Sequence, residues 1–152
     1  MKIQTTRFGE IEGDEKLIFN FKMPILGYNE ETQFVLIEPK EASLFKWLQS
    51  TNTPELAFLT TSPGLFGIDY VFELPDEAES ILDVKSADDL VVLNIAKVPN
   101  NNPRATTVNL LAPIVFNIKN NTAGQVILSG SGFAVEYPLF ENQPQPKEEE
   151  PV

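Results

Sequence analysis

Short hydrophobic segments recur along the chain and are separated by clusters of Pro, Gly and Asn. They are rich in Val, Ile, Phe, Leu and Thr, which fit a pleated, half-buried strand. Their spacing in the first half is typical of a meander. The pattern predicts five strands there, at residues 2–8, 17–21, 33–38, 44–50 and 56–61.

The pattern changes between residues 74 and 98. Pro75 is followed at once by acidic residues, which predicts a short helix over residues 74–82, because negative charge is favourable at the N-terminal end of a helix. Residues 86–89 (SADD) resemble a second helical turn capped by Ser86. The apolar run at residues 90–98 predicts a central strand that is buried on both faces.

Turn-forming residues divide the second half of the chain. Residues 99–103 (PNNNP) predict a loop, after which β character resumes over residues 106–118 and Pro113 indicates an edge position or a bulge. Residues 120–124 (NNTAG) predict the turn of a hairpin. The remaining strands are expected at residues 125–129 and 133–139.

Composition divides the chain into a folded part and a tail. With 42% hydrophobic and 22% charged residues the chain is typical of globular proteins, and its length fits one domain, assigned to residues 1–140. Residues 141–152 (ENQPQPKEEEPV) contain one apolar residue, so burial cannot offset their ordering entropy. The sequence therefore predicts a mainly β single domain with one or two short helices and a disordered acidic C-terminal tail.

The charge balance favours basic partners. The 22 acidic and 11 basic residues give a formal net charge of −11, and four glutamates and one lysine of the tail account for only −3 of it. A negative surface selects and steers positive partners. Direct binding to nucleic acid is not expected, because the Lys and Arg residues are scattered. The first hypothesis is therefore a binding protein.

The chain lacks the side chains of the commonest catalytic and metal sites. It contains no His and no Cys, so neither a Ser-His or Cys-His nucleophile nor a zinc site is expected, and no cofactor or metal is predicted. Carboxylate chemistry leaves one alternative open, a carboxylate-based small enzyme or a small-molecule-binding β-barrel. No apolar run is long enough to cross a bilayer and none resembles a signal peptide, so a cytoplasmic protein without membrane contact is expected.

Two surfaces are candidates for partner binding. Residues 63–70 (PGLFGIDY) form a glycine-containing loop with unusual apolar content, and we predict partner contacts at Phe66, Asp69 and Tyr70. The alternative is that this loop folds back and plugs the end of a barrel. The acids Asp76, Glu77 and Glu79 form either a solvated helix face or a landing patch for a basic protein. Trp47, the only tryptophan, is expected in the core.

Several motifs occur in the same order as in a known family. The chain resembles the flagellar assembly factor FliW family at TRFGEIE (6–12), WLQS (47–50), LAFL (56–59), PGLFGIDY (63–70), NLLAPIVFN (109–117) and QVIL (125–128). It departs from the family at residues 24–28 (PILGY), where the family tends to have a Leu-Pro-Gly-Phe turn. The resemblance implies a small β-barrel-like cytoplasmic protein without catalytic activity. The resemblance transfers no contact residue, and Asn109 is added to the predicted contacts as an electrostatic partner beside Asp76, Glu77 and Glu79.

The resemblance also implies partners. Proteins of this family bind CsrA, a small basic RNA-binding translational repressor, and antagonise it so that flagellin messenger RNA is translated. They also bind flagellin, which competes for the factor and releases CsrA. We therefore expect a CsrA antagonist and chaperone-like flagellin binder with no catalytic residue.

Overall fold

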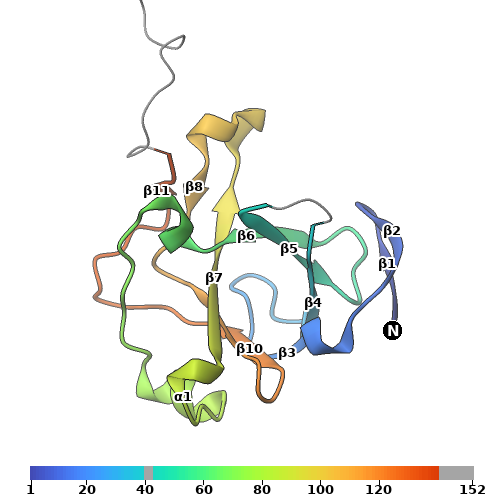
Figure 1. The fold of residues 1–152 in the computed structure, drawn as a ribbon, viewed down its shortest axis with the longest axis horizontal. Coiled ribbons are helices and arrows are strands. Elements are labelled where there is room, and N and C mark those ends of the chain that lie inside the picture. The colour runs from blue at the N-terminus through green and yellow to red at the C-terminus, as the bar shows by residue number, and fades with distance from the viewer. Residues whose placement is uncertain (40–42, 141–152) are drawn as a thin grey trace, which may run out of the picture.

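Seven strands close into a barrel in the computed structural model, which describes residues 1–39 and 43–140 (Figure 1). Neighbouring strands are antiparallel, except that β10 returns to β3 in parallel and completes the ring. The prediction of a mainly β, barrel-like fold is confirmed. In their order around the barrel the strands are β3 (Ile18–Met23), β4 (Gln33–Ile37), β5 (Phe45–Ser50), β6 (Ala57–Thr61), β7 (Leu90–Lys97), β9 (Ile114–Asn117) and β10 (Thr122–Gln125).

The other elements lie around this barrel. A separate hairpin pairs β1 (Lys2–Thr5) with β2 (Gly9–Glu12), and β7 extends beyond the barrel to pair with β8 (Thr107–Val108), which pairs with β11 (Tyr137–Pro138). Within residues 1–39 and 43–140 the structure has one α-helix, α1 (Asp76–Ile81), which lies near the start of β7 (Figure 1). Single 3₁₀ turns are η1 (Glu15–Leu17), η2 (Pro63–Phe66), η3 (Ala87–Asp89), η4 (Pro99–Asn101) and η5 (Pro103–Ala105).

Aromatic rings fill the barrel interior. Phe19 and Phe116 meet edge to face with ring centroids 4.9 Å apart, and Phe21 and Phe34 lie at the same separation. Such contacts add to the stabilisation that comes from removing the rings from water. The buried members of this core are Phe19, Phe21, Ile25, Phe34, Leu36, Leu48, Leu93, Ile114, Phe116 and Ala123.

Small residues allow the parallel contact that closes the barrel. Ala123 is completely buried opposite Phe21, and a Cβ atom added to Gly124 would lie 2.7 Å from the Cβ of Met23. A larger residue at either position would push β10 away from β3. The sequence NNTAG therefore uses its glycine for close packing of strands rather than for a turn.

The helix packs against the outside of the barrel. Ala78 and Leu82, four residues apart on one face of α1 and its C-terminal end, are buried against Val115 and its neighbours. The Asn117 side chain donates to the Leu82 carbonyl at 2.9 Å, so one of the unpaired carbonyls at the end of the helix is satisfied from β9. The helix predicted over residues 74–82 is confirmed, as is the turn that the Ser86 side chain caps at the amide of Asp88.

Two boundaries in the second half of the chain were predicted wrongly. The β region expected at residues 106–118 is interrupted at residues 109–113, and Pro113 precedes strand β9 instead of lying inside a strand. The hairpin turn lies at residues 118–121, where Asn121 adopts a φ of 56°, so residues 122–124 belong to β10. The return strand thus ends at Gln125, where it was predicted to begin.

Other differences concern strand length and burial. The hairpin partner β2 was not predicted, and the strand expected at residues 133–139 is only the two-residue β11. The run at residues 90–98 forms β7, but Val91 is 38% exposed, so the strand is not buried on both faces. The predicted tail at residues 141–152 lies outside the described residues.

Trp47 is partly buried rather than part of the core. The Arg7 guanidinium carbon lies 4.1 Å from the ring centroid, and Phe8 packs edge-on with centroids 6.3 Å apart. Both residues come from the connection between β1 and β2. The prediction of a core tryptophan was therefore wrong, because the hairpin covers this ring from outside the barrel.

Candidate functional site

The loop predicted to bind partners divides into a buried and an exposed part. Phe66 is 6% exposed and packs between Phe45 and Phe140, with ring centroids 5.6 and 5.5 Å away. Its neighbour Leu65 is 58% exposed, and Gly67 ends the 3₁₀ turn with a φ of 77°. Phe66 therefore folds back and anchors the loop, but it packs in a cluster with Val108, Leu110 and Leu139 and not in the core that fills the barrel. Leu65 is the apolar side chain that the loop offers to solvent.

Tyr70 links the loop to the strands beneath it. Its hydroxyl donates to the Leu110 carbonyl at 2.6 Å and accepts from the Asn94 amide at 3.2 Å, and its ring packs against Phe72 and Phe133. Burial raises the pKa of the Tyr70 phenol, and the hydrogen bond from Asn94 opposes that rise. Tyr70 thus fixes the C-terminal end of the loop against the barrel, and the chain continues from there along residues 71–75.

Replacing Tyr70 with phenylalanine is expected to lower the free energy of unfolding by about 1–3 kcal/mol, because the Leu110 carbonyl loses its donor. Since the folded protein favours the neutral phenol, the advantage of wild type is complete below the ordinary pKa of 10.0 and falls as the pH rises through the higher folded-state pKa. Urea unfolding at about pH 8 and above pH 10 measures both effects. The exposed Tyr28 provides the control, since Tyr28→Phe should change stability by less than about 0.5 kcal/mol. A difference between wild type and Tyr70→Phe that stays constant with pH would contradict this account.

Asn109 has a structural position. Its side-chain oxygen accepts from the amides of Leu111 and Ala112 at 3.1 and 3.0 Å, and its carbonyl accepts from Asn94. These bonds hold the backbone of residues 109–112, which connects β8 to β9. Asn109, predicted as a contact residue, therefore stabilises the backbone conformation next to Tyr70 and Asn94.

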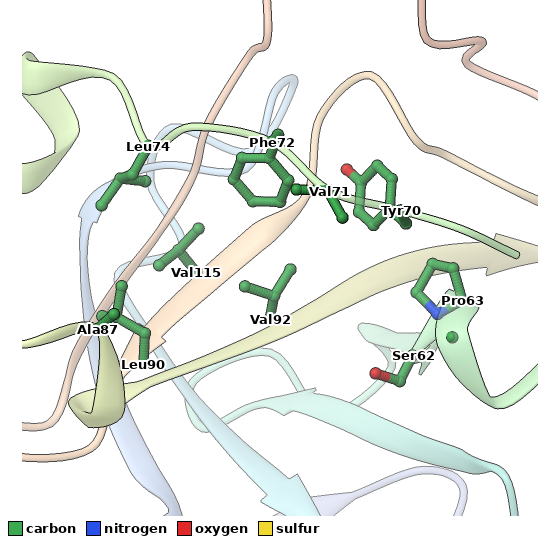
Figure 2. Close-up of a pocket in the computed structure, with 11 residues that line it drawn as sticks. Ser62, Pro63, Tyr70, Val71, Phe72, Leu74, Ala87, Leu90, Val92 and Val115 are labelled. Carbon is green, nitrogen blue, oxygen red and sulfur yellow. The ribbon is translucent and has the colours of Figure 1, made fainter.

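An apolar groove opens beside this loop. Residues 68–75 run along the outside of the barrel from η2 to α1 (Figure 1), and the space between them and the barrel wall has a volume of about 510 Å³. Figure 2 shows side chains from both walls directed into it. Its lining consists of Ser62, Pro63, Gly64, Tyr70, Val71, Phe72, Leu74, Ala87, Leu90, Val92 and Val115. We call this feature the β7 groove.

A second hollow lies on the other side of the same segment. It has a volume of about 330 Å³, and it shares Val71 and Phe72 with the β7 groove. Val71 is 79% exposed on the ridge between the two hollows. Exposed apolar side chains next to a concave apolar surface are typical of a site where another protein docks.

Acidic side chains border the β7 groove. Asp69 is exposed and precedes Tyr70 directly, and the exposed acids of α1 (Asp76, Glu77 and Glu79) follow the groove residue Leu74. Residues 69–89 contain eight acidic residues and one basic residue, a net charge of −7 out of −8 for residues 1–140. Lys85 pairs with Asp83 at 3.0 Å, whereas the three α1 acids form no ion pair within the described part of the chain. The negative charge of the body is therefore concentrated beside the groove.

The predicted site residues fall into two groups. The first group belongs to the groove: Tyr70 lines it, and the four acids Asp69, Asp76, Glu77 and Glu79 lie near its rim. The second group does not line the groove: Phe66 is buried beneath the loop, and Asn109 holds the backbone by hydrogen bonds. The strand residues of the groove floor, Leu90, Val92 and Val115, were missed. Their only signal was a continuous apolar run, which is equally typical of a buried strand.

Neither a membrane helix nor a metal cluster emerges from the described residues. Across positions 1–39 and 43–140, no helix has the length and hydropathy needed to cross a bilayer. Over the same ranges, no three Asp or Glu side chains converge closely enough to hold a metal ion.

Comparison with known proteins gives one consistent match. The model of a family described as FliW protein matches residues 2–139. The flagellar assembly factor FliW of Bacillus pumilus is 39% identical over 139 residues, covering 91% of this chain and 96% of the relative. That of Geobacter sulfurreducens is 36% identical over 147 residues, covering 97% and 91%. A solved structure, described as the crystal structure of the flagellar assembly factor FliW, matches with a TM-score of 0.85 at 35% identity, covering 95% of this chain and 100% of the other.

Proposed function

The chain belongs to the FliW family, and from that premise we propose that it is a flagellar assembly factor that works by binding proteins in the cytoplasm and catalyses no reaction. It binds the translational repressor CsrA and relieves the repression of flagellin synthesis. Flagellin is its competing partner, so free flagellin sequesters the factor and restores repression. Output then depends on the affinities and amounts of the two partners.

The observation that carries this proposal is the concentration of negative charge beside an apolar groove. A net charge of −7 over residues 69–89 attracts a basic protein such as CsrA and speeds the encounter. The exposed Leu65 and Val71 supply apolar area next to that charge. An apolar centre with a charged rim is the usual anatomy of a protein interface.

The lining of the groove supports binding over carboxylate catalysis. Its eleven residues include no Asp or Glu, so no pair of acids converges there on a substrate. Paired-acid hydrolysis needs two carboxyl groups facing each other across the reacting bond. The acids lie instead at the rim, where they face solvent and an approaching partner.

A reconstituted translation assay tests the proposal. A reporter that carries the flagellin leader is repressed by purified CsrA, and adding this protein should restore its translation in proportion to the amount added. Purified flagellin should then reverse the restoration. In the control without CsrA the protein should leave translation unchanged. Repression that persists at a large excess of the protein would contradict the proposed function.

A further inference from the structure

One side of β7 has no neighbouring strand next to the groove. Strand β6 pairs with β7 only at Thr60 with Ile95 and at Thr61 with Asn94, after which the chain turns into η2. Strand β9 occupies the opposite side of β7 over Leu90–Leu93. Among the residues that the structure describes, no strand pairs with this part of β7 on the β6 side.

Two hydrogen bonds fix which backbone groups face the open side. The amide of Asn109 donates to the carbonyl of Ile95, and that of Ile118 donates to the carbonyl of Asp89, each at 2.9 Å. Odd-numbered residues of β7 thus direct their backbone groups toward β8 and β9. Because the direction alternates along a strand, the C=O group of Leu90 and both the N–H and C=O groups of Val92 face the open side. The amide of Leu90 is already used, since it donates to the Ala87 carbonyl at the end of η3.

The open edge and the groove belong to one surface. The side chains of Leu90 and Val92 line the β7 groove, while the Leu90 carbonyl and the backbone groups of Val92 point to the edge beside it. On the other face of the strand, Val91 is 38% exposed where β6 has departed. An unpaired edge of this kind is a template for a further strand.

We propose that a partner segment in extended conformation adds to β7 at the Val92 edge, with alternate apolar side chains in the β7 groove and Lys or Arg at its flanks. This inference rests on the proposed function in that the occupant belongs to a protein partner. Strand addition draws affinity from main-chain hydrogen bonds and specificity from pockets for alternate side chains. The net charge of −7 over residues 69–89 selects the basic flanks.

Defined peptides test the mode of binding. The probe is a capped peptide Lys-Val-Thr-Val-Thr-Val-Lys, with Glu in place of both Lys as the charge control. Two further versions carry N-methyl groups either on the valine amides or on the threonine amides, which face opposite edges of the bound peptide. We expect the Lys peptide to slow hydrogen exchange at the Val92 amide, the Glu peptide to bind about tenfold more weakly, and one methylated version to lose about tenfold more affinity than the other. Equal affinities of the two methylated versions, or unchanged exchange at Val92, would overturn the proposal.

Gly64 allows the groove to be filled without strain on the fold. It lines the groove, its φ is not in the left-handed region, and an added Cβ atom would meet nothing within 4 Å. Gly64→Trp should therefore weaken binding of the Lys peptide about tenfold or more at nearly unchanged thermal stability, while the matched Gly64→Ala should bind within about twofold of wild type. A tryptophan variant that is folded and binds the peptide as wild type does would overturn the proposal.

The same variants separate this proposal from the proposed function. In one outcome, wild type and Gly64→Trp bind CsrA and flagellin with equal affinity, and the Lys peptide binds neither wild type nor Gly64→Trp. Strand addition is then wrong and the proposed function stands. If wild type binds the Lys peptide at Val92 but neither CsrA nor flagellin, the groove accepts a different partner and the proposed function fails. Loss of one natural partner together with the peptide in Gly64→Trp supports both and identifies the protein that supplies the segment.

Discussion

Replacing Phe116 with alanine is expected to lower the free energy of unfolding by about 3–5 kcal/mol, a large part of the total stability of a domain. The ring is completely buried, meets Phe19 at 4.9 Å and Phe21 at 6.1 Å between centroids, and lies on β9, which β7 and β10 flank. Its removal leaves a cavity where three strands of the barrel meet. Urea unfolding followed by the fluorescence of Trp47 measures the loss.

Two further variants control this experiment. Ile118→Ala removes an apolar side chain two residues away that is 52% exposed, so its effect should stay within about 0.5 kcal/mol. Phe116→Leu keeps part of the buried volume and should lose less than alanine does, which preserves the test if the alanine variant does not fold. A loss below about 1 kcal/mol for Phe116→Ala would show that the ring is not packed as described.

The sequence predicted strands β3 to β6 well because local patterns determine them. Residues 17–61 alternate apolar runs with turn residues, and β3, β4, β5 and β6 follow those runs within a residue or two. Antiparallel neighbours in a meander need no information from distant parts of the chain. The short helix was equally predictable, because Pro75 and the acids after it act locally.

The parallel closure of β10 against β3 could not be predicted in this way. It joins residues about 100 positions apart, and its signal is the small size of Ala123 and Gly124, which local analysis assigned to a turn. The interruption at residues 109–113 was hidden for a related reason. Asn109 acts through hydrogen bonds to Leu111 and Ala112, which an apolar pattern does not contain.

The sequence indicated the negative charge of the candidate site but not the shape of the groove. The acids Asp69, Asp76, Glu77 and Glu79 could be recognised as a cluster, because they lie close together in the sequence and their charge does not depend on the fold. The groove depends on β6 leaving β7 after Thr61, which exposes one edge of a strand that the sequence presents as buried. Only the three-dimensional arrangement places that edge beside the acids.

Reversing Asp76, Glu77 and Glu79 to lysine is expected to slow association with CsrA by about tenfold or more at low salt, because long-range attraction sets the rate of encounter. The three carboxylates are exposed on α1 and form no ion pair in the described ranges, so their field extends toward solvent. Stopped-flow or surface-based kinetics at about 20 mM and about 1 M salt measures the effect, which should nearly vanish at the higher concentration.

A matched triple variant separates the patch from net charge. Lysines at the exposed Glu10, Glu30 and Glu55 change the net charge by the same amount, from −11 to −5, but belong to other elements: β2, the β3–β4 loop and the β5–β6 turn. We expect this control to slow association far less. An unchanged rate for the α1 variant at low salt, or equal slowing by both triples, would remove the α1 patch from the binding surface. Hydrogen exchange at the amides of Leu82 and Val84, which donate to the carbonyls of Ala78 and Glu79, checks that α1 remains folded.

The central claim is that this protein works by binding two competing proteins. Its most direct test is a calorimetric titration of the purified protein with purified, RNA-free CsrA, repeated in the presence of saturating flagellin. The account predicts a saturable complex with CsrA that flagellin weakens or abolishes. If neither protein bound to the folded chain, the account would be contradicted.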